Sequence, residues 1–241
     1  MIGLGTIVNT AAIVLGGVFG LLFGRRLSER HQDTLMKTCG VTVIFIGVAG
    51  VLSKMLSVQG EALVSGRSLL LVLSAVIGAL IGETLNIEGG FARFGEWLKR
   101  KTGNAKDKSF VDAFVTASLT VSIGAMAVVG AIQDGLAGDS SVLLTKSVLD
   151  FVIIMVMTST LGKGSAFAAI PVLIVEGSLT LLARLIAPIM TDAALANLSM
   201  VGSMLIFCVG LNLTFGKRIR VANLLPALIL AVASAFLPVG L

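Results

Sequence analysis

Residues 122–157, SIGAMAVVGAIQDGLAGDSSVLLTKSVLDFVIIMVM, contain two strongly apolar runs with a short polar segment between them. The polar segment holds Gly135 and Gly138 with Asp and Ser beside them, which is the composition of a loop. Each apolar run belongs to a stretch of about 20 residues, long enough to cross the ~30 Å hydrocarbon core of a bilayer. The pattern therefore predicts a hairpin of two transmembrane helices.

The composition of the whole chain agrees with a membrane protein. Of its 241 residues, 56% are hydrophobic and 13% are charged, and the mean hydropathy is +1.03. A soluble domain carries about 25% charged residues, so this chain lacks the polar surface to face water all round. The net charge of +5 does not indicate nucleic-acid binding, because the basic residues lie in loops between apolar runs. Cys39 and Cys208 lie in or beside apolar runs, so we expect no disulfide framework.

The hydropathy pattern predicts an all-α, polytopic transmembrane helix bundle that forms a single membrane domain over residues 1–241. We expect eight spans. They are residues 2–23, 36–53, 68–87, 110–132, 143–161, 166–188, 198–215 and 221–240.

The loop charges predict the orientation of these spans. Of the 18 Lys and Arg residues, 14 lie in or beside the first, third, fifth and seventh loops. Basic residues concentrate in cytoplasmic loops, so both termini are expected outside the cytoplasm. The longest of these loops, residues 88–108, contains GGFARFGEWLKRK, with Phe91, Phe94, Trp97 and Leu98 spaced three or four apart. We expect a short amphipathic helix there, lying on the inner leaflet as an anchor.

An internal repeat is suggested by order and spacing. TIVNTAAIVLGGVFGLLFG in the first span resembles VLIVEGSLTLLARLIAP in the sixth, and the second span resembles the seventh in the same way. Because the first and sixth spans run in opposite directions, spans one to three and six to eight would form an inverted-topology repeat, a feature of secondary transporters. The alternative is that apolar segments resemble one another by composition alone.

Polar residues inside the predicted spans are the candidate ligands for a solute or ion. The repeat places Asn9 and Glu176 at equivalent positions, which a pseudo-twofold axis would bring together. Asp150 lies inside the fifth span, one turn after Lys146. The two could pair along the helix, but Lys before an acid is the weaker order for such a pair. We therefore expect Lys146 to extend to the outer interface and Asp150 to find another partner, as an ion-binding or a structural group.

Five further polar residues are considered for the site, and four of them have two interpretations. Asp134 and Asp139 fall in the predicted outer loop and are expected to be solvated, or else to form an acidic mouth that concentrates cations. Ser122 lies in a span whose Gly124 and Gly130 either mark a helix break that binds ions or allow close helix packing. Asn212 and Asn223 are second candidates for the site, although Asn212 is also placed to cap its helix.

The motifs GTIVNTAAIVLGGVFG, SIGAMAVVGAIQDGLAGD, KSVLDF and NLLPALILA resemble the bacterial "domain of unknown function 554" membrane family over nearly the whole chain. The resemblance implies a polytopic protein of the bacterial inner membrane and no settled activity. Asn9, Asp134, Lys146, Asp150 and Asn223 match its motif positions by type. It places Gln where this chain has Glu176, a departure that weakens an ionic role for that residue and leaves a polar one.

The sequence favours a small secondary transporter for an ion or small polar solute. The alternatives are a channel and a non-transporting scaffold or regulatory subunit. No enzyme is expected: His31, the single His, lies in a charged loop, and neither an H-E-x-x-H motif nor a P-loop is present. We predict no cofactor and no metal site. The expected partners are the lipid bilayer, an unidentified solute or ion, and a second copy of the chain in a homodimer.

Overall fold

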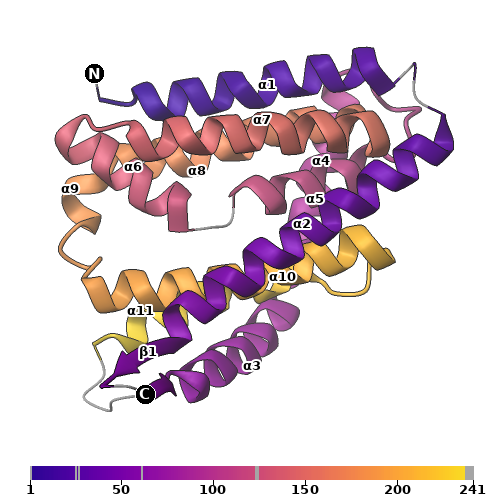
Figure 1. Cartoon of the computed structure of the whole chain (residues 1–241). Helices are drawn as coiled ribbons and strands as arrows, with labels where there is room; N and C mark the ends of the chain where they lie inside the picture. Colours follow the sequence, from indigo (N-terminus) through magenta and orange to yellow (C-terminus); the bar gives the residue numbers. More distant parts are fainter. Residues whose placement is uncertain (1, 25, 27, 61, 123–124, 237–241) are drawn as a thin grey trace.

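The computed structural model describes residues 2–24, 26, 28–60, 62–122 and 125–236. Within these residues the chain is helical apart from loops and one two-stranded hairpin (Figure 1). The elements are α1 Leu4–Gly24, α2 Glu29–Met55, β1 Leu56–Gln59, β2 Ala62–Ser65, α3 Ser68–Leu85, α4 Ile87–Lys101, α5 Phe110–Ser122, α6 Ala125–Ala137, α7 Ser141–Leu161, η1 Lys163–Ala168, α8 Ala169–Leu181, α9 Ala183–Ile186, α10 Asp192–Phe215, η2 Val221–Leu224 and α11 Pro226–Ser234.

The described residues support six or seven membrane spans, so the predicted count of eight is not confirmed. Six helical segments are long and apolar enough to cross a bilayer: α1, α2, α3, α7, η1 with α8, and α10. The bent pair α5–α6 makes a seventh if it is one span. The predicted span 221–240 contains η2 and the nine residues of α11, a helix about 14 Å long, and residues 237–240 lie outside the described part.

The predicted fourth span is broken. α5 ends at Ser122, α6 begins at Ala125, and the two helices are bent by 60°. Gly124, predicted to mark such a break, lies outside the described residues. Gly130 lies within α6, where a Cβ atom would come within 2.8 Å of Leu143 on α7. Gly130 therefore serves helix packing, the alternative that the sequence had left open.

The helices form two groups, visible as the upper and lower halves of Figure 1. The first group contains α1, α5, α6, α7 and α8, and the second contains α2, α3, α10 and α11. α1 and α7 run parallel, because Gly5 approaches Leu143 near their starts and Gly20 approaches Met155 further along. The glycines of GGVFGLLFG thus form a helix contact within the chain, one of the two alternatives for this motif.

Three other helix pairs run antiparallel. In α2–α10, Gly40 meets Gly210 and Gly50 meets Ser203, so the residue numbers run in opposite directions. α3 packs against η2 and α11 in the same antiparallel sense, and α1 packs against α8. Glycines allow close backbone approach in α2–α10 and in the contact of α3 with η2 and α11, as is usual for membrane helix interfaces.

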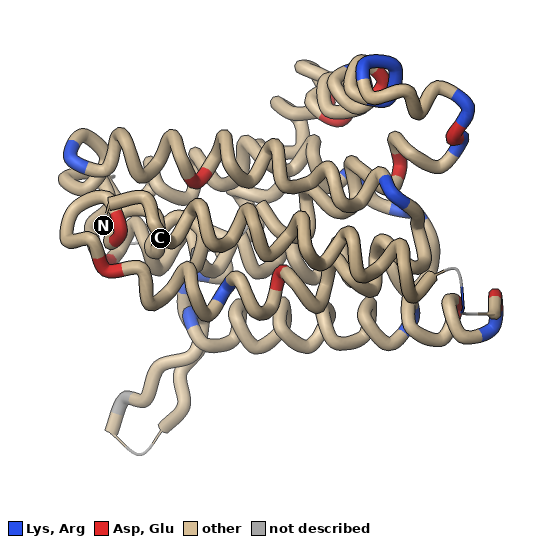
Figure 2. The backbone as a smooth tube through the Cα atoms, turned by 90° about the horizontal axis from the view of Figure 1, so that it is seen from above, with Lys and Arg blue, Asp and Glu red and all other residues tan. Residues whose placement is uncertain are grey.

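The two ends of the bundle differ. The first, which we call the hairpin end, holds β1–β2, the starts of α1 and α7, and α9 (Figure 1). The second, the basic end, holds Arg26, Lys163, Lys217 and Arg218. Most charged residues lie at the two ends or in α4, and few lie along the helices (Figure 2). The β1–β2 hairpin is a departure from the predicted all-α class, although the bundle itself is α-helical.

The predicted amphipathic helix is present as α4. Asn86 begins it, and its side chain accepts a hydrogen bond from the backbone N–H of Gly89 at 3.2 Å. The apolar stripe does not face outward as a whole. Leu98 is 5% exposed, and the Phe94 ring lies 5.8 Å from that of Phe114 on α5, whereas Trp97 is 53% exposed. α4 is therefore fastened to the bundle by part of the stripe that was predicted to contact lipid.

Candidate functional site

Four polar side chains from three helices meet inside the first helix group. They are Asn9 of α1, Lys146 and Asp150 of α7, and Glu176 of α8. Asn9 and Glu176 are 0% exposed, and Lys146 and Asp150 are no more than 6% exposed. The site lies about 14 Å along α7 from the hairpin end, at 1.5 Å per residue. We call these four residues the polar cluster.

Asn9 joins the two carboxylates. Its Nδ2 donates to Asp150 Oδ2 at 3.1 Å and to the Glu176 oxygens Oε1 and Oε2 at 3.0 and 3.1 Å. The predicted meeting of Asn9 and Glu176 is therefore present, and Asp150 lies beside them. Asn9 Oδ1 is buried and has no hydrogen-bond partner among the residues that the structure describes.

Lys146 is the fourth member of the polar cluster, and the prediction that it extends to the outer interface was wrong. Its Nζ pairs with Asp150, lies 3.4 Å from Glu176 Oε1 and donates to the Val121 carbonyl oxygen at 2.7 Å. The helix spacing i, i+4 places Lys146 and Asp150 on one face. Because α5 ends at Ser122, its last carbonyls lack helical partners and attract a positive charge. Lys146 therefore turns inward instead of extending to the interface.

The formal charges of the polar cluster do not balance. Two carboxylates, Asp150 and Glu176, face one ammonium, that of Lys146. With all three groups ionised the cluster carries one excess negative charge. Charged groups inside a membrane protein are costly and usually pair with one another or line an ion pathway.

Toward the hairpin end, the next helical turn is also polar. The Thr6 and Thr180 hydroxyls hydrogen-bond to each other at 3.2 Å, and the Gly5 N–H donates to Asp134 Oδ2 at 3.0 Å. The prediction that Asp134 is solvated was wrong, because it is 0% exposed, whereas Asp139 is exposed as expected. Gly135, taken from the sequence as a loop residue, instead allows α6 to pack closely against Thr180 and Ala183.

Toward the basic end, the next turn is apolar. Ile13, Ile154 and Val172 lie four residues from Asn9, Asp150 and Glu176 on their respective helices, and each is 0% exposed. Beyond this layer, Thr158 and Ser165 have buried hydroxyls with no hydrogen-bond partner in the described chain. The polar cluster is thus bordered by polar groups on one side and by an apolar layer on the other.

Two of the predicted site residues lie elsewhere. Asn212 closes the loop after α10: its Oδ1 accepts from the N–H groups of Arg218 and Ile219, and its Nδ2 donates to the Ile219 carbonyl at 2.7 Å. These partners lie beyond the end of α10 at Phe215, so Asn212 orders the loop and does not cap the helix as the alternative prediction had it. Asn223 accepts from the Glu88 N–H at 2.8 Å and donates to Glu83 at 2.5 Å. Both asparagines hold loops at the basic end and are not part of the polar cluster.

Ser122 borders the polar cluster from the far side of α5. Its Oγ and that of Ser118, one turn earlier, are buried and have no hydrogen-bond partner within the described residues. Both face a cavity of about 180 Å³ between α5, α8, α10 and α11, which is otherwise mostly apolar. Ser122 follows Val121, whose carbonyl holds Lys146, so only the end of α5 separates the cavity from the cluster.

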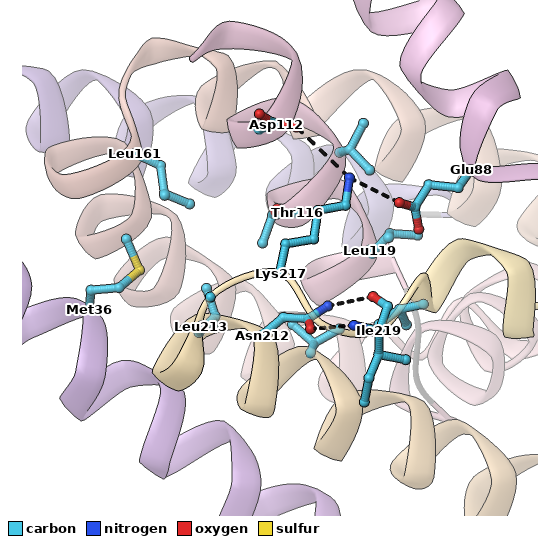
Figure 3. A pocket seen from close by; sticks show the side chains of 14 residues that line it. Met36, Glu88, Asp112, Thr116, Leu119, Leu161, Asn212, Leu213, Lys217 and Ile219 are labelled. Carbon is cyan, nitrogen blue, oxygen red and sulfur yellow. Dashed lines mark hydrogen bonds and ion pairs between the residues drawn. The ribbon is translucent and has the colours of Figure 1, made fainter.

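A second cavity, of about 340 Å³, opens at the basic end (Figure 3). Lys217 extends along it, with Nζ 2.9 Å from Glu88 and 3.9 Å from Asp112. Leu119 of α5 lines this cavity and also the smaller one. The two cavities therefore follow α5 from the basic end toward its break.

Two parts of this site were not predicted from the sequence. The Thr6–Thr180 pair was predictable, because antiparallel helices that join Asn9 to Glu176 also bring together residues three before and four after them. The Val121 carbonyl was not predictable, because a backbone group becomes a ligand only where the helix ends.

Comparison with known proteins gives the family. The family described as "Protein of unknown function (DUF554)" matches residues 4–236. YqgA of Escherichia coli (strain K12), an uncharacterized protein, is 32% identical over 95% of this chain and 94% of its own. YdfK of Bacillus subtilis (strain 168), an uncharacterized membrane protein, is 30% identical over 94% of this chain and 93% of its own. No solved structure matches the chain. The chain belongs to the DUF554 family and is a multi-pass membrane protein.

Proposed function

We propose that this member of the DUF554 family is a small secondary transporter and that the polar cluster is its solute or ion site. The observation that carries the proposal is the meeting of Asn9, Lys146, Asp150 and Glu176 inside the helix bundle. A buried ion pair rarely stabilises a fold more than well-packed apolar side chains would. Three charged groups at this depth therefore favour a role beyond packing, and no enzymatic activity is proposed for them.

The helix pairing supports an inverted repeat. α1, α2 and α3 pack against α8, α10 and α11, in that order, and each pair is antiparallel. This is the arrangement expected when a pseudo-twofold axis in the membrane plane relates spans one to three to spans six to eight. In transporters with such repeats the site lies at the repeat interface, near the middle of the membrane. Asn9 and Glu176 meet where α1 crosses α8.

The surroundings of the cluster suggest how access alternates. The polar turn of Thr6, Thr180 and Asp134 forms the approach from the hairpin end, and Ile13, Ile154 and Val172 close the direct path to the basic end. The two cavities beside α5 provide the other approach. A change in the bend between α5 and α6 would connect the smaller cavity to the cluster, as broken helices do in transporters.

The proposed orientation puts the hairpin end, with both chain termini, outside a bacterial inner membrane. The concentration of basic residues at the opposite end supports it. Green fluorescent protein does not become fluorescent after export in the unfolded state, so a fusion after Leu241 is expected to be dark. A fluorescent fusion at that position would reverse the orientation.

A homodimer stays a prediction, to be tested by the molecular mass of the purified protein.

Transport is tested in proteoliposomes. Uptake of a panel of small amino acids, organic acids, amines and alkali cations would be measured under imposed proton and sodium gradients. Uptake is expected for the wild type, with loss in Asp150→Asn. The matched control is Asp139→Asn, because Asp139 is an exposed carboxylate at the hairpin end. Equal uptake by Asp150→Asn and the wild type would remove the cluster from the pathway.

The same assay separates the alternatives. A transporter exchanges labelled for unlabelled solute across the membrane, so counterflow is expected. Flux without counterflow would assign a channel. Lack of flux for every member of the panel, with native expression and folding, would favour a scaffold or regulatory subunit.

A further inference from the structure

The Lys146 ammonium occupies a site built from oxygens. Its Nζ contacts Asp150 Oδ2, Glu176 Oε1 and the Val121 carbonyl. Asn9 brings a fourth oxygen to the same cluster, the buried Oδ1 that has no hydrogen-bond partner in the described part of the chain. Free backbone carbonyls at the ends of half-helices coordinate the coupling ion in transporters with broken helices. Carboxylate and amide oxygens are also ligands of hard cations.

We infer that a monovalent cation binds this oxygen site in exchange for the Lys146 ammonium. The inference rests on the proposed function and names the class of ion that the cluster takes. In the structure Lys146 fills the site and supplies one positive charge. A solute cation that enters between Asp150 and Glu176 would supply the second charge and bring the cluster to neutrality. The Asn9 amide, whose Nδ2 faces both carboxylates in the structure, would turn so that Oδ1 faces the cation.

The charge of the ion follows from keeping Lys146 inside the protein. Two carboxylates with one ammonium leave room for one further positive charge, which an alkali cation provides and a divalent ion exceeds. The described residues also contain no group of three or more His, Cys, Asp or Glu side chains placed to hold a metal ion, the set that divalent sites commonly use. A proton satisfies the same charge and is expected to compete with the alkali cation.

Lys146 has a place to remain when the cation displaces it from the carboxylates. Its Nζ already donates to the Val121 carbonyl, in the last turn of α5. The negative end of a helix dipole favours a positive charge there. Binding of the cation would shift the Lys146 ammonium away from Asp150 and Glu176 and toward the Val121 carbonyl of α5, next to the bend between α5 and α6. The ion site and the break are thus linked through one side chain.

The test is a thermal-shift titration of the purified full chain in detergent. NaCl, KCl or LiCl would replace N-methylglucamine chloride at constant ionic strength and pH 8. Because a ligand stabilises the state it binds, the melting temperature of the wild type is expected to rise with at least one alkali cation. Lowering the pH to 6 is expected to raise the concentration needed for half of the effect, since the proton competes.

Lys146→Met removes the resident ammonium. It is expected to melt at a lower temperature without cations and to reach half of the cation effect at about a tenfold lower concentration than the wild type, a change of about 1.4 kcal/mol in binding. Glu176→Gln leaves a neutral Lys146–Asp150 pair and is expected to lose the cation effect while it stays folded. Asp139→Asn should behave as the wild type. If Lys146→Met does not fold, Glu176→Gln still decides the matter.

Two results would overturn the inference: no alkali cation stabilises the wild type, or Glu176→Gln keeps the full cation effect. Failure of the cation-site inference can be distinguished from failure of the proposed transport function by two further results. If Asp150→Asn abolishes solute uptake but no alkali cation stabilises the wild type, the cation site is rejected and the transport function is retained. If Glu176→Gln abolishes cation stabilisation but no member of the panel is transported by the wild type, the cation site is retained and the transport function is rejected.

Discussion

The α1–α8 and α2–α10 crossings have the same antiparallel geometry and opposite chemistry. At α1–α8, polar side chains meet across the crossing, with Asn9 donating to Glu176 at 3.0 Å. At α2–α10, glycines let the two backbones come close together, and the buried side chains are mostly apolar. The α2–α10 crossing has the small residues that membrane helices require for close packing. The α1–α8 crossing contains charged groups, which packing does not require.

This difference locates the part of the bundle that is expected to move. The α2–α10 contact is continuous along both helices, from Gly40 to Gly50. The α1–α8 contact is held by hydrogen bonds, and Lys146 of α7 links Glu176 in it to the last turn of α5, next to the bend between α5 and α6. We therefore expect α2 and α10 to form the rigid side of the protein and α5–α6 to change its position relative to α1, α7 and α8.

The largest effect on folding is expected from Lys146→Met. It leaves two buried carboxylates without their ammonium, and removal of one partner of a buried ion pair costs about 3–5 kcal/mol of the free energy of unfolding. The melting temperature in sodium-free detergent solution would measure it. The matched control is the double variant Lys146→Met with Asp150→Asn, which restores the net charge of the cluster and is expected to recover part of the loss. A single variant as stable as the wild type would contradict the buried pairing.

Gly47→Ala is expected to have the next largest effect on stability, and to act through packing alone. A Cβ at Gly47 would lie 2.6 Å from the Phe207 backbone nitrogen, so α2 and α10 must separate, at a cost of about 1–3 kcal/mol. Gly90→Ala on α4 is the control, because a Cβ there meets nothing within 4 Å and alanine favours a helix. Thermal unfolding of both variants checks the prediction. Equal stability of the two would mean that the glycine contact is not close.

Asp139→Ala is expected to have the smallest effect and sharpens the contrast with buried Asp150. The Ser141 N–H donates to Asp139 Oδ1 at 3.0 Å, and this hydrogen bond lowers the pKa of the exposed carboxyl below its ordinary value of 3.8. A lowered pKa stabilises the fold at pH values above 3.8 and ceases to do so as the pH falls through the lowered value. The small difference in melting temperature from the wild type should therefore be present at neutral pH and vanish in acid. A difference that grows in acid would contradict this assignment.

The sequence predicted the helical membrane architecture and part of the site because both depend on patterns along the chain. Runs of apolar residues located the helices, and the resemblance of the first span to the sixth led to the contact of Asn9 with Glu176. The failures arose where a residue type has two uses. Gly135 was taken as a loop residue, but it permits close packing within a helical region that buries Asp134. Lys146 was expected at the interface because its partner, the Val121 carbonyl, depends on where α5 ends.

The most direct test is the initial rate at which proteoliposomes that contain Glu176→Gln take up the alkali cation that stabilises the wild type in the thermal-shift titration. The account predicts uptake by the wild type above that of protein-free liposomes and loss of this uptake in Glu176→Gln. Gly47→Ala should keep the wild-type rate per folded molecule, because it alters the packing crossing and not the polar one. Uptake by Glu176→Gln at the wild-type rate would contradict the assignment of the α1–α8 crossing as the ion site.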